Sequence, residues 1–245
     1  MRRHPAFYGA ARTAKHWFAA AVILPINQRR ELWKRTSYSP AARRREISRW
    51  RRSGKPIPPP HAFKQVTVAA YGRAFALTTL VETGTYLGDM VEAQRARFRQ
   101  IISIELAPYL YRAARSRFKR ARNVLILEGD SGELMESVLK RLDAPALFWL
   151  DGHYSAGVSA HGTLETPIQR ELETILGSSN DHVILIDDAR CFGTGDFPTL
   201  DEVSVLVARL KPGWTCFAKY DMLRIHPPTS RPRAVGETRM KATPQ

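Results

Sequence analysis

Five short runs of apolar and often β-branched residues constrain the fold more than any other feature of the chain. They lie at residues 80–82, 101–105, 124–127, 146–150 and 183–186. The segments between them, at 89–98, 107–119, 132–142 and 166–176, are rich in Ala, Leu, Glu and Arg, which favour helices. Near-continuous apolar runs are typical of strands buried on both faces of a parallel sheet. Their alternation with helices predicts an α/β fold, doubly wound around a mostly parallel sheet.

The end of the chain predicts how this sheet is completed. Residues 200–210 favour one more helix, and residues 214–220 and 222–226 favour an antiparallel pair of strands joined tightly at Asp221. The segment 227–245 is polar and contains proline, so we expect a loose tail over 231–245 after a domain that spans 63–230.

The N-terminal part differs sharply in charge from the rest. Residues 1–60 hold 15 Lys and Arg against two acids, which leaves 23 basic and 21 acidic residues in the remainder. Four prolines within residues 56–60 cannot continue a helix. We therefore predict a basic arm over 1–55, with a short helix within 39–52 that starts after Pro40, and a proline-rich linker over 56–62.

Concentrated positive charge attracts nucleic acid, anionic lipid or an acidic partner protein. The alternative is a solvated basic tail whose apolar patch, residues 17–26, packs on the domain. That patch spans about ten residues, against the roughly 20 needed to cross a bilayer, and no small-residue cleavage site follows it. Only two cysteines, Cys191 and Cys216, are present, and they fit neither a disulfide framework nor a zinc site. We expect a cytoplasmic protein, with peripheral membrane attachment through the arm as the alternative.

Carboxylates mark the ends of all five central strands. Glu82, Glu105, Asp130 and Asp151 end or follow the first four, and Asp187-Asp188 follows the fifth. Ligands of open parallel sheets bind outside the carboxyl ends of the strands. These acids are therefore expected to line one crevice.

The first strand runs into a glycine-containing turn, Glu82-Thr83-Gly84-Thr85-Tyr86-Leu87-Gly88. Glycine lets the backbone turn sharply and approach a ligand closely. The dinucleotide pattern G-x-G-x-x-G would need glycine at Tyr86, which argues against an NAD-dependent oxidoreductase. Glu105 follows Gly84 by 21 residues. At this position a carboxylate can accept hydrogen bonds from both ribose hydroxyls of a nucleoside. The alternative is that Glu105 is a solvated acid in a turn.

Taken together, Val81-Glu82-Thr83-Gly84-x-x-x-Gly88, Ser103-Ile104-Glu105 and Glu128-Gly129-Asp130-Ser131 resemble the successive cofactor motifs of class I S-adenosylmethionine (SAM)-dependent methyltransferases. The resemblance covers about residues 71–220. It implies a SAM site in which Glu82 and the loop Gly84-Thr85-Tyr86 through Gly88 approach the methionine part. It also implies that Glu105 holds the ribose, and that Asp130 and Ser131 lie beside the adenine. Tyr86 departs from the commoner glycine of the first motif.

A narrower resemblance concerns the fourth and fifth strand ends. Cation-dependent O-methyltransferases of the catechol and macrolide-sugar types are similar there, which implies that Asp151, Asp187 and Asp188 bind Mg²⁺. Hard Mg²⁺ prefers carboxylate oxygens and can lower the pKa of a bound acceptor hydroxyl. The alternative is structural: Asp188 caps a turn and Asp187 pairs with Arg190.

Asp151-Gly152-His153-Tyr154 lies directly over the expected crevice. Asp151 and His153 are the catalytic candidates, with His153 as general base, substrate contact or metal ligand, and His161 as a weaker candidate. The orientation of Glu171 stays open. The sequence thus predicts O-methylation of a small hydroxylated acceptor. A nucleic-acid methyltransferase that uses the basic arm and a SAM-fold binding protein without catalysis are the alternatives.

Overall fold

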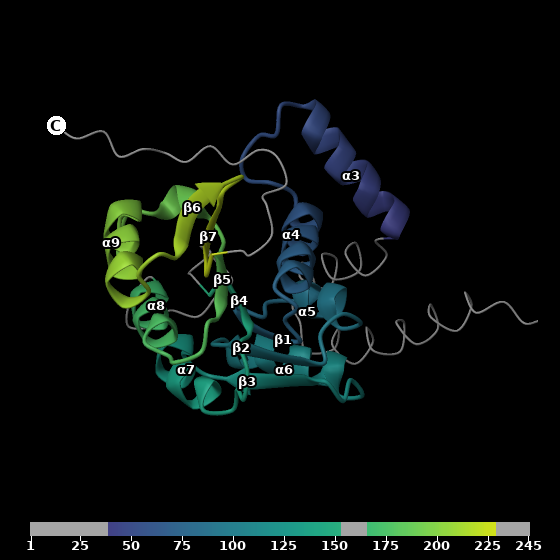
Figure 1. Ribbon diagram of the computed structural model, residues 1–245. Helices are drawn as coiled ribbons and strands as arrows, with labels where there is room; N and C mark the ends of the chain where they lie inside the picture. The colour runs from purple at the N-terminus through teal and green to yellow at the C-terminus, as the bar shows by residue number, and fades with distance from the viewer. Residues whose placement is uncertain (1–38, 153–165, 229–245) are drawn as a thin grey trace, which may run out of the picture.

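A computed structural model describes residues 39–152 and 166–228, and every strand predicted above forms within them (Figure 1). All belong to one seven-stranded sheet of order β3-β2-β1-β4-β5-β7-β6. The strands are β1 (Thr79–Thr83), β2 (Gln100–Glu105), β3 (Val124–Glu128), β4 (Leu147–Leu150), β5 (Val183–Ile186), β6 (Thr215–Lys219) and β7 (Met222–His226).

Helices connect and cover these strands. They are α3 (Pro40–Arg52), α4 (His61–Ala74), α5 (Asp89–Gln94), α6 (Pro108–Phe118), α7 (Ser131–Leu139), α8 (Ile168–Leu176) and α9 (Leu200–Leu210), with a 3₁₀ turn at Ala189–Cys191. Helix α4 was not predicted. Helix α5 is shorter than the predicted 89–98, because the chain turns after Gln94 and buries Phe98 in the core.

Strand order reverses at β1, which pairs in parallel with β2 on one side and with β4 on the other. Ligands of doubly wound sheets bind outside the carboxyl ends of the strands at such a reversal, which here lies between β1 and β4. Strand β7 then runs antiparallel to β5, and β6 antiparallel to β7. Tyr220 and Asp221 join β6 to β7 with φ angles of 51° and 58°, the left-handed pair that suits a two-residue hairpin.

The sheet is buried by helices on both faces. Phe148 and Leu150 of β4 pack with residues of α7, α8 and α9 on one face. Leu147 and Trp149, which point the opposite way, pack with residues of α4, α5 and α6 on the other. The alternation explains why β4 and β5 needed continuous apolar runs rather than a polar and an apolar face.

One strand does not fit the prediction of burial on both faces. Strand β3 lies at the edge of the sheet, and Leu125 is 37% exposed. The run Val124–Leu127 is as apolar as the others, so its position at an edge was not visible in the sequence.

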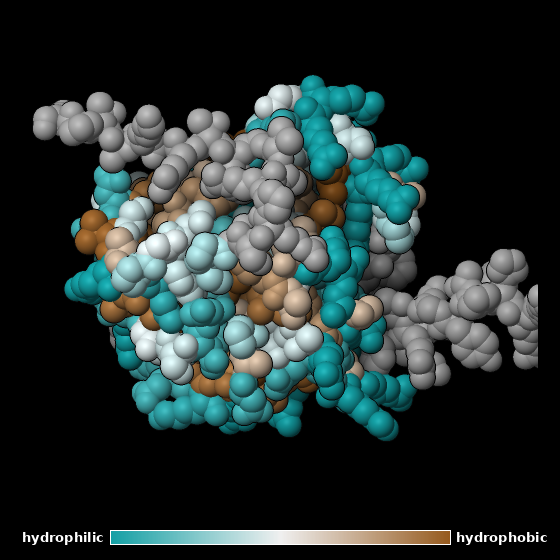
Figure 2. All heavy atoms as spheres, viewed as in Figure 1, coloured by the Kyte–Doolittle hydropathy of each residue, from teal (hydrophilic) through white to brown (hydrophobic). Residues whose placement is uncertain are grey.

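Helix α3 forms as predicted, with Ser39 as its N-cap residue. Hydrophilic side chains gather over it in the upper right of Figure 2, yet Trp50 is only 6% exposed. The Trp50 ring centroid lies 4.4 Å from that of Phe63 and 5.4 Å from that of Tyr220, and Nε1 donates to the carbonyl of Pro56 at 2.7 Å. The basic helix is therefore anchored on α4 and the β6–β7 turn by one aromatic residue.

We expect Trp50→Ala to lower the free energy of unfolding by about 3–5 kcal/mol, since it removes a buried indole and leaves a cavity. Helix α3 should then detach, so that trypsin cleaves the variant faster at Arg51 and Arg52 than the wild type. Val205→Ala on α9 is the control, because Val205 is 68% exposed. Equal urea midpoints for both variants would contradict the anchoring role of Trp50.

No helix within 39–152 and 166–228 combines the length and apolar character that a bilayer span requires.

Candidate active site

The carboxyl ends of β1, β2, β4 and β5 lie in register along one edge of the sheet. Thr83 is opposite Leu150, and Leu150 is opposite Ile186. Hydrogen bonds continue the row past the strands: the Asp151 amide donates to the Thr83 carbonyl at 3.1 Å, and the Asp187 amide to the Leu150 carbonyl at 3.0 Å. The acids that follow these strands are thus brought to the same edge, as the sequence predicted.

The turn after β1 depends on glycine at position 84. Gly84 has φ +79°, and a Cβ atom there would lie 2.3 Å from the carbonyl oxygen of Asp151. The amides of Gly84 and Thr85 both donate to the Ile104 carbonyl, at 3.0 and 3.2 Å. The first turn is therefore pressed between the ends of β2 and β4, where a side chain does not fit.

The rest of this loop includes two more left-handed residues. Tyr86 has φ 48°, and Gly88, the N-cap residue of α5, has φ +78°. The Tyr86 backbone amide donates to Glu105 Oε2 at 2.7 Å. Tyr86, which departs from the commoner glycine, thus adopts the conformation that glycine favours and is tied to the next strand end.

Glu105 ends β2 with its carboxylate buried, at 5% exposure. Oε2 accepts from the amide of Tyr86, and Oε1 from the amide of Ala107 at 2.9 Å. Burial raises the pKa of the Glu105 carboxyl, and these backbone donors work against that rise. A carboxylate has about four acceptor positions, so two such bonds orient it and leave it able to accept from a vicinal diol. The alternative of a solvated turn acid does not fit this burial.

Glu82 lies beneath the loop rather than on its surface. It is 2% exposed, and its Oε2 accepts from Ser103 Oγ at 2.5 Å; Ser103 Oγ lies 2.6 Å from Thr85 Oγ1. Burial holds the pKa of the Glu82 carboxyl well above its usual range. Glu82 therefore supports Thr85 through Ser103, a positioning role that fits a place under a ligand-binding loop.

Asp130 and Ser131 begin helix α7. Asp130 is the N-cap residue, and its Oδ1 accepts from the Gly132 amide at 2.8 Å and the Glu133 amide at 3.3 Å. Ser131 is 7% exposed, and a Cβ built at Gly152 would lie 3.4 Å from its Oγ. The cap accounts for Asp130 structurally, while Ser131 borders the strand end that carries Asp151.

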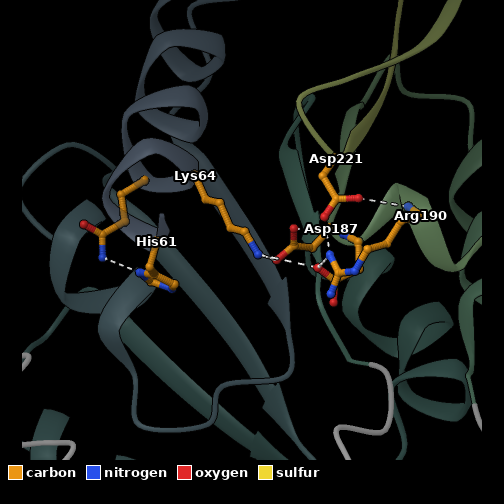
Figure 3. A network of polar contacts seen from close by, with 7 residues as sticks. His61, Lys64, Asp187, Arg190 and Asp221 are labelled. Carbon is orange, nitrogen blue, oxygen red and sulfur yellow. Dashed lines mark hydrogen bonds and ion pairs between the residues drawn. The ribbon is translucent and has the colours of Figure 1, made fainter. Parts of the chain in front are cut away.

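Figure 3 shows the acids at the end of β5 pairing with cations. Lys64, on α4, forms an ion pair with Asp187 and lies 3.6 Å from Asp188 Oδ1. Arg190 pairs with Asp188 at 2.7 Å and with Asp221. The predicted alternative, in which Asp187 pairs with Arg190, is therefore wrong: Asp187 pairs with Lys64 instead. Asp188 does occupy the N-cap position of the turn Ala189–Cys191, with φ 53°, but its side chain makes no capping hydrogen bond.

Lys64 is the site residue that sequence analysis missed. Burial opposes its charge, but the attraction of Asp187, Asp151 and Asp188 outweighs that effect, and the pKa of Lys64 is raised above its usual value. One feature of the sequence could have drawn attention to it: Lys64 is the only Lys or Arg within residues 61–72. Without helix α4 in the prediction, nothing placed this lysine near the strand ends.

Three further residues singled out in the sequence are His153, His161 and Glu171. His153 and His161 fall within 153–165, outside the described residues. Glu171, whose orientation the sequence left open, is buried in α8 at 1% exposure. Among the described residues, no group of three or more His, Cys, Asp and Glu side chains is placed to hold a metal ion. The Mg²⁺ site at Asp151, Asp187 and Asp188 stays a prediction from the resemblance.

Comparison with solved structures identifies the fold. An O-methyltransferase from Bacillus cereus, solved in complex with S-adenosylhomocysteine (SAH), matches 89% of this chain and 99% of its own, with a TM-score of 0.51 and 13% identity. The chain has the Rossmann-like methyltransferase fold. The resemblance drawn from the sequence is thereby confirmed at the level of this fold.

Two further structures with the methyltransferase fold are similar at lower scores. An SAH-bound methyltransferase from Podospora anserina matches 83% of this chain and 88% of its own (TM-score 0.47, 17% identity). The O-methyltransferase TomG from Streptomyces achromogenes, in complex with SAM, matches 78% and 91% (TM-score 0.45, 14% identity). No protein-family model and no curated protein matches the chain.

Proposed function

We propose that this protein is a SAM-dependent methyltransferase that methylates an oxygen of a small hydroxylated acceptor. The observation that carries the proposal is the pairing of the Gly84 turn with the buried carboxylate of Glu105 at the strand-order reversal. A buried carboxylate oriented by two backbone amides suits a ribose diol, and a tight glycine turn lets the backbone approach a charged amino-acid group. The SAH bound to the similar Bacillus cereus enzyme agrees with this choice.

Each part of the cofactor has residues in this chain that would hold it. Glu105 would accept hydrogen bonds from the ribose hydroxyls. The loop from Gly84 through Thr85 and Tyr86 to Gly88 would border the methionine part, and Asp130 and Ser131 would border the adenine. Glu82 keeps Thr85 in place from below. When bound, SAM supplies an electrophilic methyl group on a sulfonium.

The acceptor would enter over the ends of β4 and β5, beside Asp151. Its hydroxyl oxygen forms the new C–O bond as the C–S bond breaks, so SAH leaves and one proton must depart from the oxygen. We assign that proton to His153, whose unperturbed pKa of ~6.5 suits a general base. The remaining catalytic effect comes from holding oxygen, methyl carbon and sulfur in line. The proposed reaction uses no metal ion, because Lys64 already pairs with Asp187.

The acceptor class is tested with methyl-labelled SAM. The full-length protein is incubated with catechols, hydroxylated sugars, or RNA, and label transfer is measured. Label on a small hydroxylated compound, at a rate that His153→Ala lowers, supports the proposal. Label on RNA alone would replace it with the nucleic-acid alternative. SAM binding with no transfer to any member of the panel would favour a binding protein.

A separate proposal is that the basic helix α3 binds an anionic partner. Its exposed arginines, Arg44, Arg45, Arg49, Arg51 and Arg52, present a cationic surface. Such a surface suits anionic lipid, nucleic acid or an acidic partner. Salt-dependent binding to RNA or to anionic vesicles would distinguish the first two from the third.

A pH dependence follows from Glu105. Ribose binding needs its carboxylate ionised, and burial raises the pKa of Glu105 above its usual value. SAM affinity should therefore fall as pH is lowered through that raised pKa, by up to about tenfold per unit below it. The dissociation constant is measured by calorimetry between about pH 7.5 and pH 5. Glu105→Gln should bind weakly at every pH, and an equally steep loss in that variant would assign the titration elsewhere.

A further inference from the structure

The negative charges of Asp187 and Asp188 at the end of β5 are already paired with basic side chains of the same chain. Lys64 extends from helix α4 across to the carboxylate of Asp187 (Figure 3). Its ammonium also lies 3.6 Å from Asp188 Oδ1 and feels the attraction of Asp151. These are the three acids that the sequence predicted as ligands of Mg²⁺. One lysine from a different part of the chain thus pairs with Asp187 and lies close to Asp188, two of the three predicted ligands.

Three carboxylate oxygens of Asp187 and Asp188 already accept hydrogen bonds. Asp187 Oδ1 accepts from the backbone amide of Asp188 at 2.9 Å, and Oδ2 accepts from Lys64. Asp188 Oδ1 accepts from Arg190 at 2.7 Å. A divalent ion bound to Asp187 Oδ2 would compete with the Lys64 ammonium for the same oxygen, because Mg²⁺ requires oxygen atoms at roughly 2.0–2.1 Å in octahedral geometry.

Burial makes displacement of the Lys64 ammonium costly. The side chain of Lys64 is 12% exposed and that of Asp187 only 2%. A dication placed against Asp187 would repel the ammonium, and the lysine, held on the first turn of α4, would have to leave its partner. The residues present therefore do not fit a divalent cation while Lys64 stays in place.

We propose that Lys64 is a built-in substitute for the metal: its ammonium supplies the positive charge at the ends of β4 and β5, and the protein works without a divalent cation. As far as catalysis is concerned, this inference rests on the proposed function. Lys64 would act by neutralising Asp187 and by presenting a fixed positive charge beside an acceptor oxygen that loses its proton.

Metal binding tests this without cofactor or acceptor. Free Mn²⁺, which prefers the same oxygen ligands as Mg²⁺, is followed by electron paramagnetic resonance in titrations of the full-length protein. We expect no saturable site in the wild type up to about 1 mM. Lys64→Ala, which removes the cation from Asp187, should bind one Mn²⁺ at least tenfold more tightly, and Lys64→Ala/Asp187→Asn should lose that site. Lys64→Arg should behave as the wild type.

Two controls keep the result decisive. Lys140→Ala removes a lysine from an exposed pair with Glu136 and should leave Mn²⁺ binding unchanged. Lys64→Gln replaces Lys64→Ala if the latter does not fold by circular dichroism. One tight Mn²⁺ in the wild type overturns the proposal whatever the variants do, and so does a folded Lys64→Ala or Lys64→Gln variant that gains no site. The Mn²⁺ titrations contain no SAM, so their outcome does not depend on whether the protein binds SAM. A failure of SAM binding, which would contradict the proposed function, is measured in a separate titration.

Discussion

Gly84→Ala is expected to abolish cofactor binding and to destabilise the protein. The new methyl would lie 2.3 Å from the backbone oxygen of Asp151 and 3.1 Å from Gly152 Cα, so β1 and β4 would have to separate at their ends. Overpacking of this kind costs about 1–3 kcal/mol, and the positive φ adds roughly 1 kcal/mol. We expect a loss of about 2–4 kcal/mol in the free energy of unfolding, and SAH affinity lower by on the order of a hundredfold.

Gly213→Ala separates the two causes. Gly213 has φ +82°, close to that of Gly84, but nothing lies within 4 Å of a Cβ at that position. This control should lose only about 1 kcal/mol and bind SAH as the wild type does. Both variants are compared by urea unfolding and by SAH titration. Equal losses in the two would mean that the close approach of Gly84 to Asp151 has no role of its own.

Lys64→Met should be the most destabilising change at the strand ends. It leaves the carboxylate of Asp187 buried without its cation, and breaking a buried pair in this way costs about 3–5 kcal/mol. Asp187→Asn should cost less, because Lys64 keeps Asp188 nearby. The double variant should lose less than the two single losses added, with a coupling of about 2 kcal/mol.

Unfolding in urea at neutral pH measures all three variants. Lys140→Met is the matched control: its pair with Glu136 is exposed on both sides, so no measurable change is expected. Strictly additive losses for Lys64 and Asp187 would show that the pair is not coupled and would remove the basis for a built-in cation.

The sheet was predictable because each central strand is a continuous apolar run that ends in an acid. Val183–Ile186 and Leu147–Leu150 are buried on both faces, so nothing polar interrupts them. The same rule failed for β3: an edge strand can be as apolar as a central one, since lateral position depends on pairing and not on composition.

The site was predictable to the extent that it lies next to strand ends. Glu105 ends β2 and Gly84 follows β1, so their convergence was expected from parallel order alone. Lys64 belongs to a helix that precedes the first strand, and its contact with Asp187 spans 123 positions. Only the packing of α4 against the sheet brings the two together, and no local pattern encodes that packing.

Calorimetric titration of SAH and SAM into the full-length protein tests the central claim most directly. We predict one binding site for each ligand in the wild type, and affinity at least tenfold weaker in Glu105→Ala. Glu136→Ala is the control: the Glu136 side chain is 73% exposed and belongs to none of the cofactor motifs, so this variant should bind as the wild type does. A folded wild type that binds neither ligand, or Glu105→Ala that binds both with unchanged affinity, would contradict the proposed cofactor site.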